Sequence, residues 1–172
     1  MNLAAKNLFL TGPPGIGKTT VIQRTVERLS VVARGFYTRE LREGSRRVGF
    51  SIITLDGREG ILAHVDATGK HRVGQYTVNL QDIERLAVPA MTPRSPDELV
   101  IIDEVGKMEC FSEAFRKAVI AVLDSPNRVL GTIAAKGSAF IESVKQRKDV
   151  SVLTVTPSNR DSLPEELAAK LR

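Results

Sequence analysis

A glycine-rich stretch near the N-terminus constrains the fold of this chain more than any other feature. Residues 12–19 read GPPGIGKT and fit the pattern G-x-x-x-x-G-K-[ST], in which backbone N–H groups surround nucleotide phosphates. The apolar run at residues 7–11 predicts a buried strand before it, and apolar residues at helical spacing continue after it until Gly35. Strand, loop and helix therefore follow in the order that a phosphate-binding loop requires.

The residue types in this loop match the chemistry of a triphosphate. Gly15 and Gly17 allow backbone angles that turn amides inward at a helix N-terminus, where the helix dipole favours anions. Lys18 adds a cation, and the Thr19 hydroxyl is placed to bind Mg²⁺ between the β and γ phosphates. A plain glycine turn would leave Lys18 and Thr19 unexplained. The predicted nucleotide-binding residues here are Gly12, Pro13, Pro14, Gly15, Ile16, Gly17, Lys18, Thr19 and Thr20.

Length and composition predict one domain over residues 1–172, located in the cytoplasm. The single cysteine, Cys110, cannot form an internal disulfide and is expected to be a small buried residue. Residues 1–6 lack the apolar core of a signal peptide, and no apolar run approaches the length of a membrane span. The formal net charge of +5 is spread along the chain. Nucleic acid is therefore not expected as the principal substrate, and no membrane contact is expected.

An alternating pattern follows the first helix. Residues 35–42, 48–55 and 61–65 predict three antiparallel strands joined by turns at 43–45 and 56–57, which form a β meander inserted at about residues 35–66. Phe36, Thr38, Glu40 and Arg42 share one face of the first strand. This row either lines the nucleotide cleft or faces solvent.

A second anchor lies at residues 99–104, LVIIDE. Four apolar residues predict a strand buried on both faces, and two carboxylates follow where it ends. Beside a phosphate loop, Asp103 is expected to hold Mg²⁺ and Glu104 to polarise an attacking water, which makes hydrolysis the natural reaction. Without the loop, a solvated strand end would be the simpler interpretation.

The remaining chain alternates between helices and strands. We expect a helix at residues 78–87 capped near Asn79 and ended by Pro89, a helix capped by Ser112, a helix at 138–146, and a last helix with a capping box at Ser162. Strands are expected at 128–134 and 150–156. This order predicts an α/β fold with a mainly parallel, doubly wound sheet, helices on both faces and ligands at the carboxyl ends of the strands. His64 and His71 lack the spacing of a metal pair.

With these motifs in view, the chain resembles the thermophilic-type P-loop nucleoside-triphosphatases, the family of the human cancer-related nucleoside-triphosphatase. The resemblance covers nearly the full length. Its most specific motifs are residues 12–20, 35–42 with 47–50, 73–79, 100–109 and 156–161, and the sequence GKME at 106–109 is the most telling because other P-loop ATPases do not need it.

The resemblance implies Mg²⁺-dependent hydrolysis of ATP, GTP, CTP, TTP and UTP to nucleoside diphosphate and phosphate, with weak base preference. It also implies a second nucleotide-binding stretch, formed by Val100, Ile101, Ile102, Asp103, Glu104, Val105, Gly106 and Lys107.

Three alternatives stay open at this point. Arg42, Lys107 and Arg160 are candidates for an arginine-finger role, and Asn159 with Arg160 is also a candidate contact for base or sugar. A P-loop kinase that transfers the γ phosphate to a small molecule or a nucleic-acid end has the same fold. A nucleotide-dependent binding module that uses hydrolysis as a switch is a third possibility.

Overall fold

The structure is a computed structural model that describes residues 5–172. The expectation for the N-terminus falls mainly on residues 1–4, which lie outside the described residues. Within residues 5–172, nine strands form one mixed sheet in the order β5-β6-β4-β3-β2-β7-β8-β1-β9. The strands are β1 (Asn7–Thr11), β2 (Ala33–Glu43), β3 (Arg46–Thr54), β4 (Glu59–His64), β5 (Arg72–Val73), β6 (Tyr76–Val78), β7 (Leu99–Val105), β8 (Arg128–Ile133) and β9 (Val150–Thr154).

The sheet has a parallel half and an antiparallel half that meet in β2. Residues 33–36 of β2 pair in parallel with β7, and residues 36–43 pair in antiparallel with β3. Gly35 lies at this junction with φ +126°, and a Cβ there would lie 1.9 Å from the Ile101 carbonyl oxygen. Only glycine fits so close to β7. The predicted meander is present, but its first strand is also a core strand, and it continues into β5 and β6, which the alternation did not indicate.

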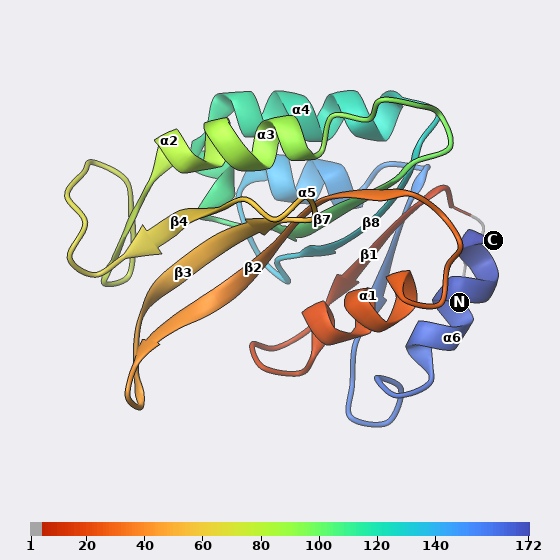
Figure 1. The fold of residues 1–172 in the computed structure, drawn as a ribbon, viewed down its shortest axis with the longest axis horizontal. Coiled ribbons are helices and arrows are strands. Elements are labelled where there is room, and N and C mark those ends of the chain that lie inside the picture. Colours follow the sequence, from red (N-terminus) through yellow and green to blue (C-terminus); the bar gives the residue numbers. More distant parts are fainter. Residues whose placement is uncertain (1–4) are drawn as a thin grey trace.

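Helices cover both faces of the sheet, as expected (Figure 1). Helix α1 (Lys18–Val26) and helix α6 (Leu163–Leu171) lie on one face. The other face carries α2 (Leu80–Asp82), the π-helical η1 (Ile83–Ala87), α3 (Val88–Ala90), the 3₁₀ helix η2 (Glu109–Phe111), α4 (Glu113–Asp124) and α5 (Ala139–Lys145).

Each face buries its own apolar cluster, because successive strand residues point to opposite sides. Leu8 and Leu10 of β1 belong to the cluster under α1 and α6, whereas Phe9 belongs to the cluster under α4 and α5. The doubly wound α/β architecture is therefore confirmed.

Two predicted helices have different bounds in the structure. Helix α1 ends at Val26 rather than near Gly35, because the N–H groups of Arg28 and Leu29 bond to carbonyls three residues back and tighten the chain into a turn. The apolar residues after Val26 still pack on the core, which explains the misleading periodicity. The helix predicted at 78–87 runs instead from Leu80 to Ala90 and passes through Pro89.

The helix caps agree with the sequence except at Ser162. Asn79, Ser112 and Ser138 each accept a hydrogen bond from a backbone N–H three residues on. Ser162 does not, because its backbone is already helical and its hydroxyl donates to the Asn159 carbonyl. The predicted capping box is absent. Among residues 5–172, no helix combines the length and apolar character needed to cross a membrane.

Candidate active site

The loop between β1 and α1 has the backbone geometry of an anion-binding turn. Gly15 has φ +76° and Gly17, the N-cap of α1, has φ +106°, both in the region that favours glycine. Lys18 begins the helix, and its Nζ donates to the carbonyl oxygens of Gly12 at 2.9 Å and Pro13 at 3.2 Å. The cation therefore lies over the loop, as the motif predicts.

The hydroxyl of Thr19 joins this loop to the tip of β7. Its Oγ1 donates to Asp103 Oδ2 at 2.6 Å, across 84 residues of sequence. Thr132 of β8 donates to the other carboxylate oxygen, Oδ1, also at 2.6 Å. Asp103 is only 2% exposed, and its burial raises the pKa of the carboxyl, although these hydrogen bonds oppose the shift. The loop and the acidic strand tip therefore form one site.

Glu104 lies next to this carboxylate at the end of β7. Its side chain is partly buried, and burial followed by the charge of Asp103 raises its pKa, whereas the charge of Lys18 lowers it. The peptide bond between Asp103 and Glu104 is cis. A carboxyl group with a raised pKa beside a phosphate loop is suited to accept a proton or to orient water.

The apolar residues of β7 support the site indirectly, by holding the strand in the sheet. Val100, Ile101, Ile102 and Val105 are fully buried, so their side chains cannot contact a ligand. The sequence stretch 100–107 therefore contributes its polar tip to the site, and its apolar residues anchor that tip in the sheet.

Oxygen donors suited to Mg²⁺ occur together here. A threonine hydroxyl and a carboxylate that already touch at 2.6 Å are hard ligands of the kind that this ion takes in nucleotide sites. The Asp103 carboxylate is buried, and no ion pair compensates its charge among residues 5–172, so a cation fits the site electrostatically. Thr19 and Asp103 would hold the ion.

The other predicted residues lie around this centre in different ways. Arg160 lines a cavity of about 240 Å³ together with Gly15 and Gly17, beside the phosphate loop. Asn159 instead bonds within its own turn: it accepts from the Thr156 N–H and donates to the Thr154 carbonyl.

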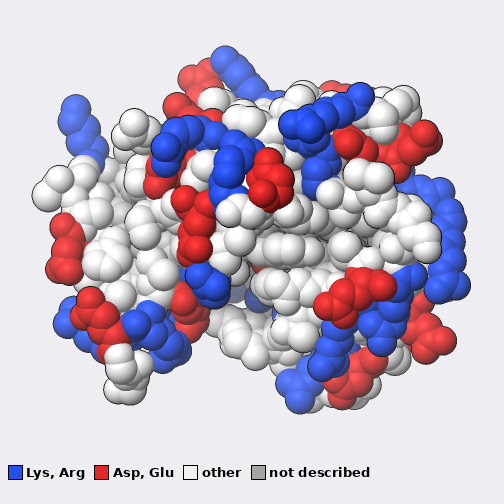
Figure 2. All heavy atoms as spheres, viewed as in Figure 1, with Lys and Arg blue, Asp and Glu red and all other residues white. Residues whose placement is uncertain are grey.

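Lys107 and Arg42 lie elsewhere in the structure. Lys107 lines a second cavity of about 420 Å³ beyond the tip of β7, whose other lining residues are Arg72, Val73, Cys110, Phe111 and Ser138. Arg42 is bonded to Glu40 and to the Ser45 carbonyl inside the β2–β3 hairpin. Figure 2 shows the surface hollowed between this hairpin and the loop before α1.

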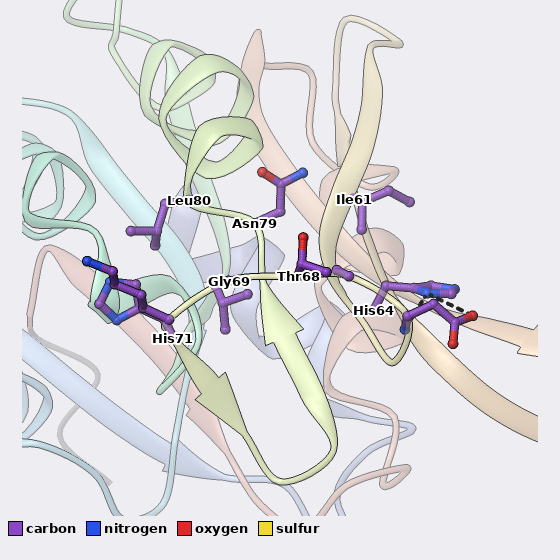
Figure 3. A pocket seen from close by; sticks show the side chains of 11 residues that line it. Ile61, His64, Thr68, Gly69, His71, Asn79 and Leu80 are labelled. Carbon is purple, nitrogen blue, oxygen red and sulfur yellow. Dashed lines mark hydrogen bonds and ion pairs between the residues drawn. The ribbon is translucent and has the colours of Figure 1, made fainter.

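A cavity larger than these two lies away from the chemistry. It has a volume of about 650 Å³, is open to solvent and is lined by the end of β4, residues 66–71 and the start of α2 (Figure 3). His64 and His71 both line it, but no residue of the phosphate loop or of β7 does. Size alone would therefore point to the wrong region.

Two polar residues of the site escaped the sequence analysis. Thr132 had no local signal, since a threonine in a strand becomes a carboxylate partner only through the pairing of β7 with β8. Glu109 is 4% exposed, and burial followed by the charge of Glu104 raises its pKa well above the ordinary value. The sequence analysis noted Glu109 only as the last residue of the GKME motif and assigned it no role in the site. Cys110 is buried as predicted, and burial raises the pKa of its thiol to about 12.

The chain is similar to proteins from distant organisms over nearly its whole length. It is 45% identical to nucleoside-triphosphatase THEP1 of Thermotoga maritima, with 96% of this chain and 95% of that protein covered. It is also 45% identical to the human cancer-related nucleoside-triphosphatase, with coverage of 92% and 93%.

Solved structures agree with this similarity. The crystal structure of THEP1 from Aquifex aeolicus superposes with a TM-score of 0.88 at 36% identity, covering 96% of this chain and 99% of that chain. The solution structure of a human cancer-related nucleoside triphosphatase gives 0.83 at 42% identity, covering 98% of each chain. A family model described as NTPase matches residues 7–168. The chain therefore belongs to the NTPase family whose members include the THEP1 and cancer-related nucleoside-triphosphatases.

Proposed function

We propose that this protein hydrolyses nucleoside triphosphates to nucleoside diphosphate and phosphate in a Mg²⁺-dependent reaction with weak preference among the bases. The observation that carries the proposal is the 2.6 Å hydrogen bond between Thr19 and Asp103, which joins the phosphate loop to the acidic tip of β7. The relatives named nucleoside-triphosphatases support the same activity.

Residues of the phosphate loop and of the tip of β7 have separate roles in this reaction. Backbone amides of the loop and Lys18 bind the β and γ phosphates and neutralise their charge. Thr19 and Asp103 would hold Mg²⁺, which when bound would further neutralise the charge of these phosphates. Glu104 orients water for in-line attack on the γ phosphorus and accepts a proton from it.

Weak base preference is supported by the lining of the cavity beside the loop. Its lining residues include no aromatic ring on which a base could stack, and its hydrogen-bonding side chains are Thr20, Arg24, Arg160 and Asp161. We assign Arg160, which lines this cavity beside Gly15 and Gly17, to the phosphates, the sugar or the base of the nucleotide.

The decisive experiment is phosphate release from each of the five common triphosphates, with Mg²⁺ and with a chelator. We expect similar rates for all five with Mg²⁺ and none with the chelator. Binding without release from any triphosphate would reject hydrolysis.

A phosphotransferase is the second candidate, because the cavity of about 420 Å³ beside Lys107 offers room for an acceptor. Transfer to an acceptor predicts that release is slow alone and that added nucleosides or RNA divert the phosphate. Release at an unchanged rate in their presence would favour hydrolysis.

A further inference from the structure

Glu109 is a buried carboxyl group that the steps above do not use. It is the first residue of η2, five positions after Glu104, and is 4% exposed. Among residues 5–172, no lysine or arginine lies within ion-pair distance of its carboxyl group. Burying an acid without a counter-charge costs free energy, so packing alone is a poor explanation for a glutamate here.

The Glu109 carboxyl lies against the backbone of the turn that contains Gly106. The backbone N–H groups of Glu109 and Gly106 favour its charged form and lower its pKa, but burial and the charge of Glu104 raise the pKa more. The turn is closed by the Cys110 N–H, which donates to the Gly106 carbonyl at 3.1 Å, and by Arg116, whose Nη1 donates to the Cys110 carbonyl at 2.6 Å. The turn that follows β7 is therefore closed by backbone hydrogen bonds and by Arg116, and the Glu109 carboxyl lies against it at Gly106.

Gly106 is flanked by both glutamates. A Cβ on Gly106 would lie 2.7 Å from Glu109 Oε2 and 3.4 Å from both Cγ and Cδ of Glu104. The side chains of Glu104 and Glu109 therefore both lie against Gly106, on the side that a Cβ would occupy. Among the described residues, no hydrogen-bond donor holds the Glu104 carboxylate, so its orientation depends on packing in this turn.

We propose that Glu109 is a positioning residue: its carboxyl group fixes the turn at Gly106 and, through this turn, the orientation of the Glu104 carboxylate toward the attacking water. The proposal rests on the proposed hydrolysis. Partners that orient a reacting group typically contribute about 10- to 100-fold to activity, and a displacement of about 1 Å can cost about 100-fold.

The test compares two substitutions at this position. Glu109→Ala leaves Gly106 without its partner, and we expect kcat to fall about 10- to 100-fold while the affinity for a Mg²⁺-bound non-hydrolysable triphosphate changes less than about threefold. Glu109→Gln keeps the volume and an acceptor for the Gly106 N–H, so it should retain kcat within about threefold. If Glu109→Ala does not fold, Glu109→Asp, which withdraws the carboxyl by one methylene, replaces it and should lose about tenfold.

Glu98 provides a matched control at the opposite end of β7. It is also buried, at 9% exposed, and its carboxylate also caps a turn by accepting from the N–H groups of Arg94 and Ser95. Glu98→Ala should lower the melting temperature and leave kcat unchanged. An equal loss of kcat in Glu98→Ala and Glu109→Ala would reduce Glu109 to a stability role and overturn the proposal.

A double-mutant cycle identifies the path of the effect. If Glu109 acts through Glu104, Glu109→Ala should change the residual rate of Glu104→Gln by less than about twofold, because the group that it positions no longer works. A full further loss in the double variant would overturn the proposal, as would an unchanged kcat in Glu109→Ala. Wild-type protein that releases no phosphate would instead reject the proposed function, and the positioning role with it.

Discussion

Acidic side chains at the two ends of the parallel strands differ in whether they form ion pairs. At the amino ends, Glu98 Oε1 lies 3.9 Å from Arg34 Nη1. The guanidinium of Arg147 donates hydrogen bonds to the Asp149 carboxylate and lowers its pKa. At the carboxyl ends, burial raises the pKa values of Asp103, Glu104 and Glu109, and none of them has an ion pair within the described chain.

This contrast separates stability from function. Paired acids at the amino ends stabilise the folded chain, whereas unpaired buried acids at the carboxyl ends cost stability. Residues that cost stability and lie together in a cleft are typical of a functional site. The uncompensated negative charge matches a cation that arrives with the substrate.

The largest effect on activity is expected for Lys18, at the carboxyl ends of the parallel strands, with Lys6 at their amino ends as the control. Lys18→Ala removes the cation over the phosphate loop and should lower kcat/KM by about 10³-fold or more, because both binding and transition-state stabilisation are lost. Lys6, whose Nζ donates to the carbonyls of Leu123 and Ser125 at the end of α4, is the control. Lys6→Ala should keep its activity in the phosphate-release assay and should unfold at lower urea concentration. Wild-type activity in Lys18→Ala would contradict the functional role assigned to the carboxyl ends of the strands.

Glu104→Gln should come next. It keeps the shape of the side chain but cannot accept a proton, so phosphate release should fall about 10²- to 10³-fold while Mg²⁺-nucleotide binding persists. Titration with a fluorescent triphosphate analogue measures the binding. Full hydrolysis by Glu104→Gln would remove this glutamate from its assigned role.

The pH dependence of stability sharpens the contrast without any substrate. The raised pKa values of Asp103, Glu104 and Glu109 mean that the folded state binds more protons than the unfolded state above the ordinary values of 3.8 and 4.5. Their effect is therefore to lower the free energy of unfolding as pH rises through the folded pKa values, by up to about 1.4 kcal/mol for each unit of raised pKa.

Asp149 should have the opposite sign. Its pKa is lowered by the hydrogen bond from Arg147, so its stabilisation is fully present above pH 3.8 and is lost as pH falls through the lower folded value. Urea denaturation across pH, without nucleotide or divalent cation, measures both trends. Glu109→Gln should reduce the loss of stability as pH rises, and Asp149→Asn should reduce the loss of stability as pH falls. If Glu109→Gln changed only the loss at low pH, or Asp149→Asn only the loss at high pH, the contrast between the two ends would be wrong.

The smallest effect is expected at Arg147, which pairs with Asp124 and Asp149 on a partly exposed surface. Arg147→Ala should lower the free energy of unfolding by about 0.5–1 kcal/mol, less in high salt, and leave phosphate release unchanged. A loss of activity without a loss of stability would show that the amino ends are not merely structural.

The sequence predicted the parts of the site whose requirements are local. Glycines at positive φ and a lysine at the start of a helix must occur in a fixed order, and a strand buried on both faces reads as a continuous apolar run. The contacts of Thr132 and Glu109 depend on strand pairing and on burial, which no local pattern encodes. The same holds for the end of α1, where apolar residues continue at helical spacing although the chain has already left the helix.

The dual role of β2 has a mechanical consequence. Because β2 pairs with β7 through residues 33–36 and with β3 through residues 36–43, the hairpin continues directly from the parallel half of the sheet, and its ladder is interrupted only by a register shift between Leu41 and Arg42 near the tip. The base of the hairpin cannot swing as a hinged lid without breaking the pairing of β2 with β7. We therefore expect this base to move together with the parallel strands, and any bending of the hairpin to occur at the irregularity between Leu41 and Arg42 and in the tip beyond it.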